Sequence, residues 1–372
     1  MKTISLYIHI PFCVRKCLYC DFLSFSADKE KRSAYLKALK EEIALKGSEY
    51  KDYEVNTVFF GGGTPSILSG DEIMGITDAI NSYFNLRDNP EISMEINPGT
   101  EHDVLSYRKS GINRLSIGLQ SANEQELKKL GRIHGLSDFE TLYEQVLSNG
   151  FTNVNVDLMY GIPGQTLSSY ERSLKYLADN PRLCKPTHVS AYSLSVEEGT
   201  PFSKMKLDLP DEEDERRMYA MTDEILSSSG FKRYEISNHA LPGYECEHNK
   251  VYWKRGNYLG LGLGASSMVQ NVRWKNTDDM DEYLKHGFLR VDVKELSLNE
   301  QMEEFMFLGL RMMEGVSLAQ FKEIFGIPLP ERYGQIINKY ISMKLLKMVN
   351  ECVMLTEDGI SVSNVIMADF LE

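Results

Sequence analysis

The stretch Tyr7-Ile-His-Ile-Pro-Phe-Cys13-Val-Arg-Lys-Cys17-Leu-Tyr-Cys20-Asp-Phe22 decides the interpretation of the whole chain. It begins as an alternating apolar run, which predicts a β-strand, and continues into a loop with three cysteines. Three thiolates can hold three corners of a cubane cluster and leave the fourth iron without a protein ligand. The two residues after Cys20 supply no fourth ligand, which disfavours a closed zinc site. We therefore predict an iron–sulfur site with Cys13, Cys17 and Cys20 as metal ligands.

Two other interpretations of this stretch are weaker. His9 belongs to the alternating run Ile4–Ile10, so we expect it to be packed or hydrogen-bonded rather than a ligand. A disulfide would need an oxidising compartment, and the N-terminus shows no signal peptide. No apolar run reaches the roughly 18 residues that a membrane helix needs, so we expect no direct membrane anchor and a cytoplasmic location. The remaining cysteines are isolated and are predicted to be buried or partly buried thiols: Cys184, Cys246 and Cys352.

Length and composition limit the class of protein. The chain has 372 residues, enough for two or three domains with a large core. Apolar residues make up 42% and charged residues 26%, as in ordinary globular proteins. The formal net charge of −13 argues against nucleic acid as a partner, because proteins that bind phosphate backbones concentrate Lys and Arg.

The first two-thirds of the chain alternates apolar runs with amphipathic stretches, which predicts an α/β fold built from six β/α units. Right-handed crossovers curl such a sheet into a partial (β/α)6 barrel, which stays open. The predicted strands are Ile4–Ile10, Val55–Phe60, Ile92–Ile96, Arg114–Leu119, Val154–Met159 and Val189–Leu194. The predicted helices are Lys29–Lys46, Asp71–Phe84, Glu101–Ser110, Glu124–Leu130, Asp138–Ser148 and Leu167–Leu177.

Unusual residues follow several of these strands, at the end where a parallel barrel collects its chemistry. The turn Gly61-Gly-Gly-Thr-Pro65 lets the backbone approach a ligand and offers N–H groups to a carboxylate. Glu95 can meet a cationic group, and Gln120 offers both a donor and an acceptor. Asp157 lies in an otherwise apolar strand, so it needs a partner or a ligand. For Arg132 the sequence leaves three interpretations open: it pairs with the carboxylate of Asp157, it contacts the ligand, or it is a surface residue at a helix end.

The cysteine spacing, the aromatic residue that follows it and the glycine turn resemble the radical S-adenosylmethionine superfamily, in the branch of the oxygen-independent coproporphyrinogen III oxidases. The resemblance implies a [4Fe-4S] cluster on the three cysteines and S-adenosylmethionine bound at the open iron. It implies a radical formed by cleavage of S-adenosylmethionine, for which an electron donor would be needed. The residues matched to S-adenosylmethionine contacts are Tyr7, Tyr19, Gly62, Gly63, Thr64, Glu95, Gln120, Arg132, Asp157 and Ala191.

Two departures point to one branch within this resemblance. The porphyrinogen oxidases have a further cysteine two residues after the third cluster cysteine, where this chain has Phe22. They also have a substantial segment before the first strand, whereas here the strand begins directly after Met1-Lys-Thr. Both features are similar to those of the heme chaperones, the HemW group.

A second stretch supports the same branch. Cys246-Glu-His248-Asn249-Lys-Val-Tyr252-Trp253 looks like the His-Asn-x-x-Tyr-Trp motif of those chaperones. The resemblance implies that His248 ligates heme and that Tyr252 and Trp253 stack on it, chemistry that suits a neutral imidazole and large aromatic rings. Without the resemblance, His248 would be interpreted as a core histidine beside aromatic residues.

The pattern changes from Ser297 onward. Amphipathic stretches at Glu300–Met313, Ser317–Phe325 and Tyr333–Met343, followed by a hairpin at Leu346–Leu355, predict a C-terminal α+β winged-helix-like domain. We therefore divide the chain into a radical-SAM core at 1–235, an extension with the histidine motif at 236–296 and the C-terminal domain at 297–372.

Three functions of different classes follow from the sequence. The favoured one is a heme-binding chaperone that delivers heme, as ligand or cargo, to acceptor proteins and carries the cluster and S-adenosylmethionine. The first alternative is a radical enzyme that acts on a porphyrinogen, and the second is a cluster-bearing structural or redox-sensing module. A homodimer is a further expectation from the resemblance.

Overall fold

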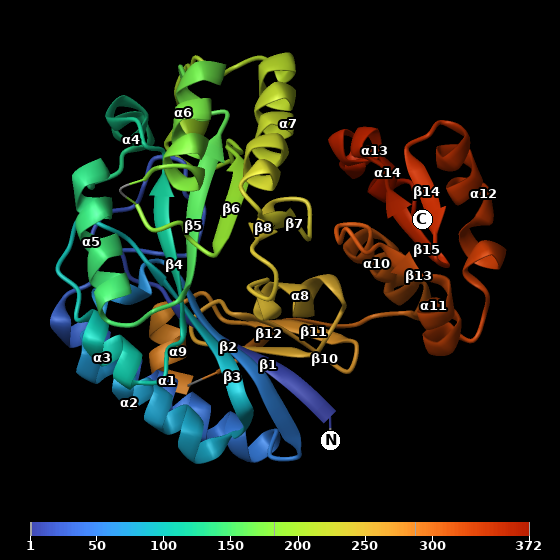
Figure 1. Cartoon of the computed structure of the whole chain (residues 1–372). Coiled ribbons are helices and arrows are strands. Elements are labelled where there is room, and N and C mark those ends of the chain that lie inside the picture. The colour runs from blue at the N-terminus through green and yellow to red at the C-terminus, as the bar shows by residue number, and fades with distance from the viewer. Residues whose placement is uncertain (1, 182, 287, 372) are drawn as a thin grey trace.

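A twelve-stranded curved sheet organises most of the chain in this computed structural model, which describes residues 2–181, 183–286 and 288–371 (Figure 1). The strand order is β12-β11-β10-β9-β1-β2-β3-β4-β5-β6-β8-β7. Strands β1 to β6 pair in parallel and in sequence order, as six β/α units require. Helices of these units lie outside the curved sheet (Figure 1).

Most bounds of the six units agree with the predicted ones, because most strands are short apolar runs and the helices are longer amphipathic ones. The third strand is the exception: it begins at Asn85 and not at Ile92, because its first half is polar and gives no apolar signal. The strands are β1 (Lys2–Ile10), β2 (Tyr53–Gly62), β3 (Asn85–Ile96), β4 (Arg114–Gln120), β5 (Asn153–Tyr160) and β6 (His188–Ser193). The helices are α1 (Lys29–Glu49), α2 (Gly70–Tyr83), α3 (Val104–Lys109), α4 (Glu124–Leu130), α5 (Leu136–Ser148), α6 (Leu167–Ala178) and α7 (Glu212–Ser228), with 3-10 turns at Pro65–Ile67 and Phe202–Lys204.

The residues after α7 extend the same sheet at both of its edges. One edge gains β7 (Lys232–Arg233) and β8 (Asn238–Ala240), both antiparallel. The other edge gains β9 (Tyr258–Leu261), which pairs in parallel with β1, followed by the antiparallel strands β10 (Ser266–Val269), β11 (Val272–Asn276) and β12 (Arg290–Glu295). Since β7 and β12 do not pair in the described residues, the barrel is open, as predicted.

Two short helices accompany these added strands, α8 (Glu247–Trp253) and α9 (Met280–His286). The helix α8 carries the predicted histidine motif and contacts β2. Stretches that the sequence assigned to an extension at 236–296 thus supply strands to the central sheet. The three-part division of the chain stays a prediction.

The C-terminal part has its own apolar core and lies beside the β7 and α8 region (Figure 1). It contains α10 (Leu298–Gly309), β13 (Val316–Ser317), α11 (Leu318–Phe325), α12 (Leu329–Ser342), β14 (Leu346–Val349), β15 (Cys352–Leu355), α13 (Glu357–Ser361) and α14 (Ser363–Ala368). The Ser317 cap is present, and its side chain accepts from the Gln320 amide. The predicted three helices and hairpin are therefore confirmed, whereas β13, α13 and α14 are too short to give a periodic signal.

Several finer expectations are settled by the structure. His9 is buried and hydrogen-bonded, with Nε2 2.9 Å from the Leu23 carbonyl oxygen, as expected for a packed residue. The prediction for Cys184 is wrong, because its side chain is exposed.

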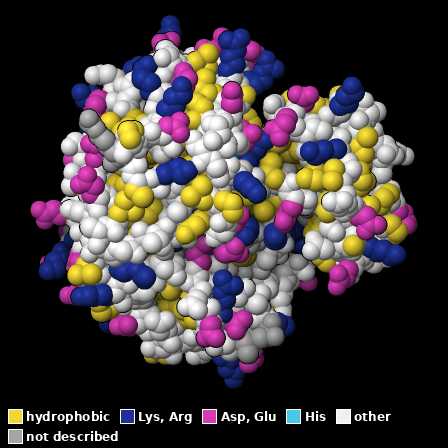
Figure 2. Space-filling view, in the orientation of Figure 1, with side chains coloured by type: hydrophobic (Ala, Val, Ile, Leu, Met, Phe, Trp, Pro, Cys, Tyr) yellow, Lys and Arg dark blue, Asp and Glu magenta, His cyan; other side chains and the backbone are white. Residues whose placement is uncertain are grey.

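Charged side chains of both signs are interspersed over the face shown in Figure 2. Across the described residues, no helix combines the length and apolar character needed to cross a membrane.

Candidate functional site

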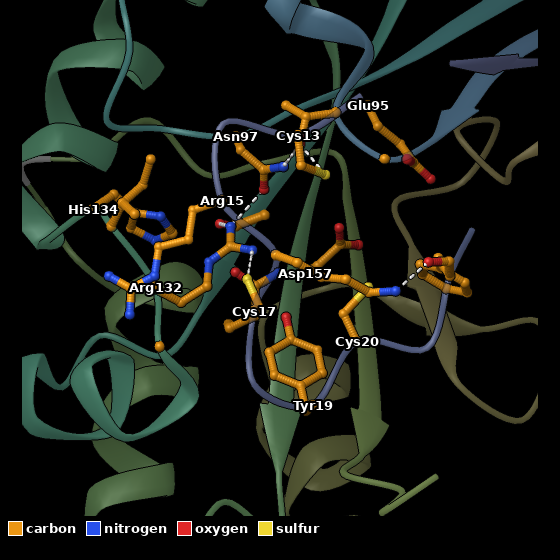
Figure 3. A pocket seen from close by; sticks show the side chains of 18 of the residues that line it. Cys13, Arg15, Cys17, Tyr19, Cys20, Glu95, Asn97, Arg132, His134 and Asp157 are labelled. Atoms are coloured by element: carbon orange, nitrogen blue, oxygen red, sulfur yellow. Dashed lines mark hydrogen bonds between the residues drawn. The ribbon is translucent and has the colours of Figure 1, made fainter. Parts of the chain in front are cut away.

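A cavity of about 330 Å³ lies at the carboxyl ends of the parallel strands, where a barrel of this type places its chemistry. The loop after β1 and the ends of β2 to β6 line it (Figure 3). Eleven of the residues predicted from the sequence line this cavity: Cys13, Cys17, Tyr19, Cys20, Gly62, Gly63, Thr64, Glu95, Gln120, Arg132 and Asp157.

The three cysteines belong to one loop that is fastened at three points. The Cys13 amide donates to the Phe25 carbonyl at 3.0 Å, and the Leu18 amide donates to the Leu130 carbonyl at the end of α4, at 3.1 Å. The Cys13 Sγ lies 3.4 Å from Thr64 Oγ1, at the end of β2. All three sulfur-bearing residues line the cavity, so the loop is held in place by neighbouring strand ends.

The donor set suits a cluster better than a single metal ion. Within the described residues, no three His, Cys, Asp or Glu side chains are grouped as the ligands of one ion. A cubane cluster instead takes one thiolate at each iron, so its cysteines surround it from different corners. Burial raises the pKa of the Cys20 thiol, a cost that binding to iron would offset because metal ligation requires the thiolate.

The glycine turn after β2 packs against the cysteine loop rather than offering free N–H groups. The Gly63 amide donates to the Ile10 carbonyl at 2.9 Å, and the Thr64 amide donates to the Phe12 carbonyl at 2.8 Å. A Cβ added to Gly63 would stand 2.6 Å from the Phe12 oxygen, so only glycine fits. The predicted donation of these amides to a ligand carboxylate is therefore wrong for Gly63 and Thr64, whose amide donors are already used.

Two of the carboxyl groups that line the cavity, Glu95 and Asp157, come from the strands β3 and β5. Glu95 Oε2 accepts from the Gly62 amide at 3.2 Å, and burial, helped by the charge of Asp157, raises the Glu95 pKa to about 8. Asp157 Oδ1 accepts from Asn155 Nδ2 at 2.7 Å, and burial raises its pKa as well. Neither forms an ion pair within the described residues, although the charge of Arg114 acts on Asp157 and partly offsets the rise of its pKa. A cationic ligand group would supply the missing charge.

Polar atoms without partners also face this region. The buried Gln120 Oε1 accepts no hydrogen bond, nor does His134 Nδ1. The backbone of Gln120 is left-handed, with φ of 63°, a strained conformation for a residue other than glycine. Since both side chains line the cavity, a ligand with N–H or O–H donors would satisfy them.

Arg132 does not form the ion pair with Asp157 that the sequence left open. Its guanidinium donates to Cys17 Sγ at 3.5 Å, to the Gly118 carbonyl at 2.9 Å and to Asn97 Oδ1. Asn97 in turn donates to Thr64 Oγ1 at 3.1 Å. The resulting chain of contacts connects Cys17 with the strand ends of β2, β3 and β4 (Figure 3).

The other predicted contacts of S-adenosylmethionine lie outside the cavity lining. Tyr7 packs beside Gly61, and its hydroxyl lies 3.1 Å from His9 Nδ1. Ala191 is buried, and its amide donates to the Ser237 carbonyl at 2.8 Å. Neither side chain lines the cavity, so each can support the lining residues but does not face the cavity itself.

The predicted heme motif lies on α8, and none of its residues His248, Tyr252 and Trp253 lines this cavity. His248 is 1% exposed, with Nδ1 2.7 Å from Thr57 Oγ1 and Nε2 2.8 Å from the Tyr252 hydroxyl. Burial, with the nearby Arg114 charge, lowers the His248 pKa to about 3, so the ring is neutral. Trp253 lines a second cavity of about 330 Å³, together with Phe305, Met312 and Ile324 from the C-terminal part.

Asn97 and His134 are among the residues of the first cavity that sequence reasoning missed. Asn97 stands directly before Pro98 at a strand end, and His134 stands two residues after Arg132. Their position at strand and helix ends was the only available signal. The partners of Asn97, which are Arg132 and Thr64, come from other units of the fold, and His134 lies near the Leu119 carbonyl fifteen positions earlier, so no local pattern predicts these contacts.

An open sheet whose central strands β1 to β6 are parallel, with a three-cysteine loop after β1, is typical of the class of radical S-adenosylmethionine proteins. The model of the Radical SAM superfamily matches residues 7–177, and that of the HemN C-terminal domain matches residues 296–362. Superfamily membership implies a [4Fe-4S] cluster and S-adenosylmethionine, and the thiols, carboxyl groups and unpartnered acceptors of the cavity fit both.

Comparison with curated proteins narrows this class. The heme chaperone HemW of Lactococcus lactis is 34% identical over 378 aligned positions, covering 100% of this chain and 98% of that protein. The heme chaperone HemW of Bacillus subtilis is 35% identical, with 99% of each chain covered. The chain belongs to the HemW family.

A solved structure supports the fold independently. Coproporphyrinogen III oxidase (HemN) from Escherichia coli superposes with a TM-score of 0.86 over 99% of this chain and 90% of that one. The two sequences are only 23% identical, so this similarity is evidence for the fold alone.

Proposed function

We propose that this protein binds heme and delivers it to acceptor proteins, and that it carries a [4Fe-4S] cluster and S-adenosylmethionine in the cavity at the strand ends. The observation that carries the proposal is similarity over the full chain to heme chaperones, 34% identical in Lactococcus lactis and 35% in Bacillus subtilis. The exposed Phe22, in place of a fourth cysteine, is consistent with that branch.

The cluster would be held by Cys13, Cys17 and Cys20, one thiolate to each of three irons. The three thiolates would leave the fourth iron without a protein ligand and therefore open to S-adenosylmethionine. When reduced, the cluster supplies the electron that cleaves the sulfonium of this cofactor. The work of the protein is to hold, orient and shield the bound groups, as the fastening of the loop to Phe25, Leu130 and Thr64 supports.

The proposed contacts of S-adenosylmethionine follow the chemistry of the cavity wall. Glu95 and Asp157 would face its cationic groups, and Gln120 Oε1 would accept from a hydroxyl or amino group. Gly62 and Gly63 would allow close approach of the backbone, and Tyr19, Thr64 and Arg132 complete the wall. Tyr7 and Ala191 would act by supporting this wall from behind.

For heme we propose the α8 motif. Trp253 already lines the second cavity and stacks with Arg311, whose guanidinium carbon is 4.4 Å from the ring centroid. Ligation by His248 requires that α8 moves, because both imidazole nitrogens are hydrogen-bonded inside the protein. Tyr252, the partner of one of these nitrogens, would be freed by the same movement.

The proposal includes further partners. Thiolates that hold a cluster need a reducing compartment, so we place the protein in the cytoplasm. Heme acceptor proteins are required for delivery, and an electron donor is required only if S-adenosylmethionine is cleaved. Association into a homodimer is part of the same proposal.

Heme titration of the anaerobically reconstituted protein, followed by absorbance, tests the function. We expect stoichiometric binding that weakens at least about tenfold in His248→Ala, the effect of losing one metal ligand. In parallel, coproporphyrinogen III is offered with S-adenosylmethionine and a reductant. Decarboxylated product without a stable heme complex would contradict the chaperone function and establish the radical enzyme instead.

A further inference from the structure

Arg132 is the one cationic side chain of the described residues with a recorded hydrogen bond to a cysteine sulfur. Its Nη1 donates to Cys17 Sγ at 3.5 Å, while Nη2 donates to the Gly118 carbonyl and to Asn97 Oδ1. Figure 3 shows the guanidinium between Asn97 and Cys17. The other recorded sulfur contact in the loop, Thr64 to Cys13, involves a neutral hydroxyl.

The backbone holds Arg132 in this place. Helix α4 ends at Leu130, and Gly131 follows in the left-handed conformation, with φ of 75°. A Cβ on Gly131 would stand 2.7 Å from Leu18 Cγ, so the turn and the cysteine loop are in direct contact. The Leu18 amide donates to the Leu130 carbonyl, which fixes the loop relative to Arg132.

The positive charge of Arg132 is not neutralised by a carboxylate. Its recorded partners in the described chain are a thiol, an amide oxygen and a peptide oxygen. Of the carboxyl groups that line the cavity, Glu95 bonds to the Gly62 amide, Asp157 to Asn155 and Ser116, and Glu197 to Ser195, and none forms an ion pair with Arg132 within the described residues. A guanidinium without a carboxylate partner, directed at a sulfur, is arranged to stabilise negative charge on that sulfur.

We propose that Arg132 raises the reduction potential of the cluster through its charge and its N–H···S hydrogen bond to Cys17. Reduction adds one electron to the cluster and makes it more negative, so a nearby cation and a donor to a ligating sulfur favour the reduced form. Arg132 thus acts as a positioning residue for Cys17 and makes the cluster easier to reduce. This inference rests on the cluster of the proposed function, and it is independent of heme.

A redox titration of the reconstituted protein tests the proposal. The fraction of reduced cluster is followed by electron paramagnetic resonance in wild type, Arg132→Leu and Arg132→Lys. We expect a more negative midpoint potential in Arg132→Leu and a smaller shift in Arg132→Lys, which keeps the charge but not the planar donor. The matched control is Arg15→Gln, which removes a cation that lines the same cavity but, within the described residues, donates no hydrogen bond to a cysteine sulfur; we expect a clearly smaller shift than in Arg132→Leu.

Each other outcome would overturn the proposal. An unchanged potential in Arg132→Leu with full iron content would show that the contact does not affect the cluster, while the cluster itself would stand. An equal shift of the midpoint potential in Arg15→Gln would show that any positive charge near the cluster raises its potential, without a hydrogen bond to Cys17. Loss of iron in both Arg132 variants, with unchanged circular dichroism, would assign Arg132 to cluster assembly instead. Absence of iron in wild type would contradict the proposed function separately.

Discussion

Glu95 should make the binding of a cationic ligand depend on pH. Its pKa is raised to about 8, by burial first and then by the charge of Asp157, so it is largely protonated at neutral pH. The ionised form attracts a cation, and it becomes populated as pH rises. We expect the affinity of the reconstituted protein for S-adenosylmethionine to increase about twentyfold between about pH 6.5 and pH 8.5, and to level off above about pH 9. Isothermal titration calorimetry checks this.

The control for this pH dependence is Glu95→Gln, which keeps the shape of the side chain but cannot ionise. Its affinity should lie below that of wild type at high pH and change little across the range. Asp157 also has a raised pKa, so the difference between the two proteins is the informative quantity. The same slope in both would rule out Glu95 as the group responsible.

The turn at the end of β2 depends on the absence of a side chain at Gly62. Its φ is 113°, and a Cβ there would fall on the His9 ring. Gly150 is a matched comparison, since its φ is 82° and a Cβ would meet nothing within 4 Å. We expect Gly150→Ala to cost about 1 kcal/mol of unfolding free energy and Gly62→Ala about 3 kcal/mol. Urea denaturation measures both.

Gly62→Ala should also reduce the iron content after reconstitution, because this turn packs against the cysteine loop. Gly150→Ala should reach the iron content of wild type after reconstitution. If the two variants lose equal stability, backbone strain alone would explain the effect and the contact with His9 would be irrelevant.

Helix α8 is anchored by one carboxylate. Glu91 accepts from the amides of Glu247 and His248, at 3.0 and 3.1 Å. Glu91→Ala would leave these buried donors unpaired, at a cost of about 2 kcal/mol. We expect faster hydrogen exchange in α8 than in wild type. If heme binding requires α8 to move, this variant should bind heme more tightly, because the conformation in which α8 has moved and His248 is accessible is more populated.

The matched comparison is His248→Ala, which should bind heme more weakly. Opposite effects of the two variants would support release of a buried histidine. Weaker heme binding in both would contradict a movement of α8 and indicate that the helix binds in the conformation described above.

At the scale of the whole molecule, buried Glu42 of α1 joins this helix to the segment that contains β9, β11 and α9. Its carboxylate accepts from Asn276 Nδ2 at 2.7 Å, and from the Gly262 amide and the Tyr283 hydroxyl, both at 2.8 Å. Burial raises its pKa to about 7. Between the unfolded pKa and pH 7 the folded state binds more protons, so stability falls as pH rises through this window and then levels off.

We expect this single group to remove about 3 kcal/mol of unfolding free energy between pH 4 and pH 8. Urea denaturation at several pH values measures it, and Glu42→Gln is the reference that lacks the titration. A pH dependence identical in wild type and Glu42→Gln would contradict the assignment. Since Glu42 bonds to residues more than two hundred positions away, Glu42→Ala should destabilise the core and the added strands together.

The C-terminal part joins the core through backbone and ionic contacts. The Ile236 amide donates to the Arg311 carbonyl at 3.1 Å, and the Met313 amide donates to the Tyr234 carbonyl at 3.0 Å. Arg233 pairs with Glu357 at the same junction. The second cavity, which Trp253 lines, lies beside these contacts, so the placement of the C-terminal part also shapes the proposed heme site.

The sequence by itself determined the six β/α units, the open sheet and the three-cysteine loop. Each is encoded by residues close together in the chain, through apolar periodicity or short spacing. For the same reason the capped helix at Leu318–Phe325 and the hairpin at Leu346–Leu355 were predictable. Local signals of this kind do not depend on what the rest of the chain does.

Only the tertiary structure decided which side chains meet. Arg132 could have paired with Asp157, but the turn after α4 places it against Cys17 and Asn97. His248 is enclosed because α8 packs on β2, and Gly63 donates its amide to β1. These choices depend on the relative positions of elements far apart in the sequence, where burial and hydrogen bonding select among partners that no local pattern distinguishes.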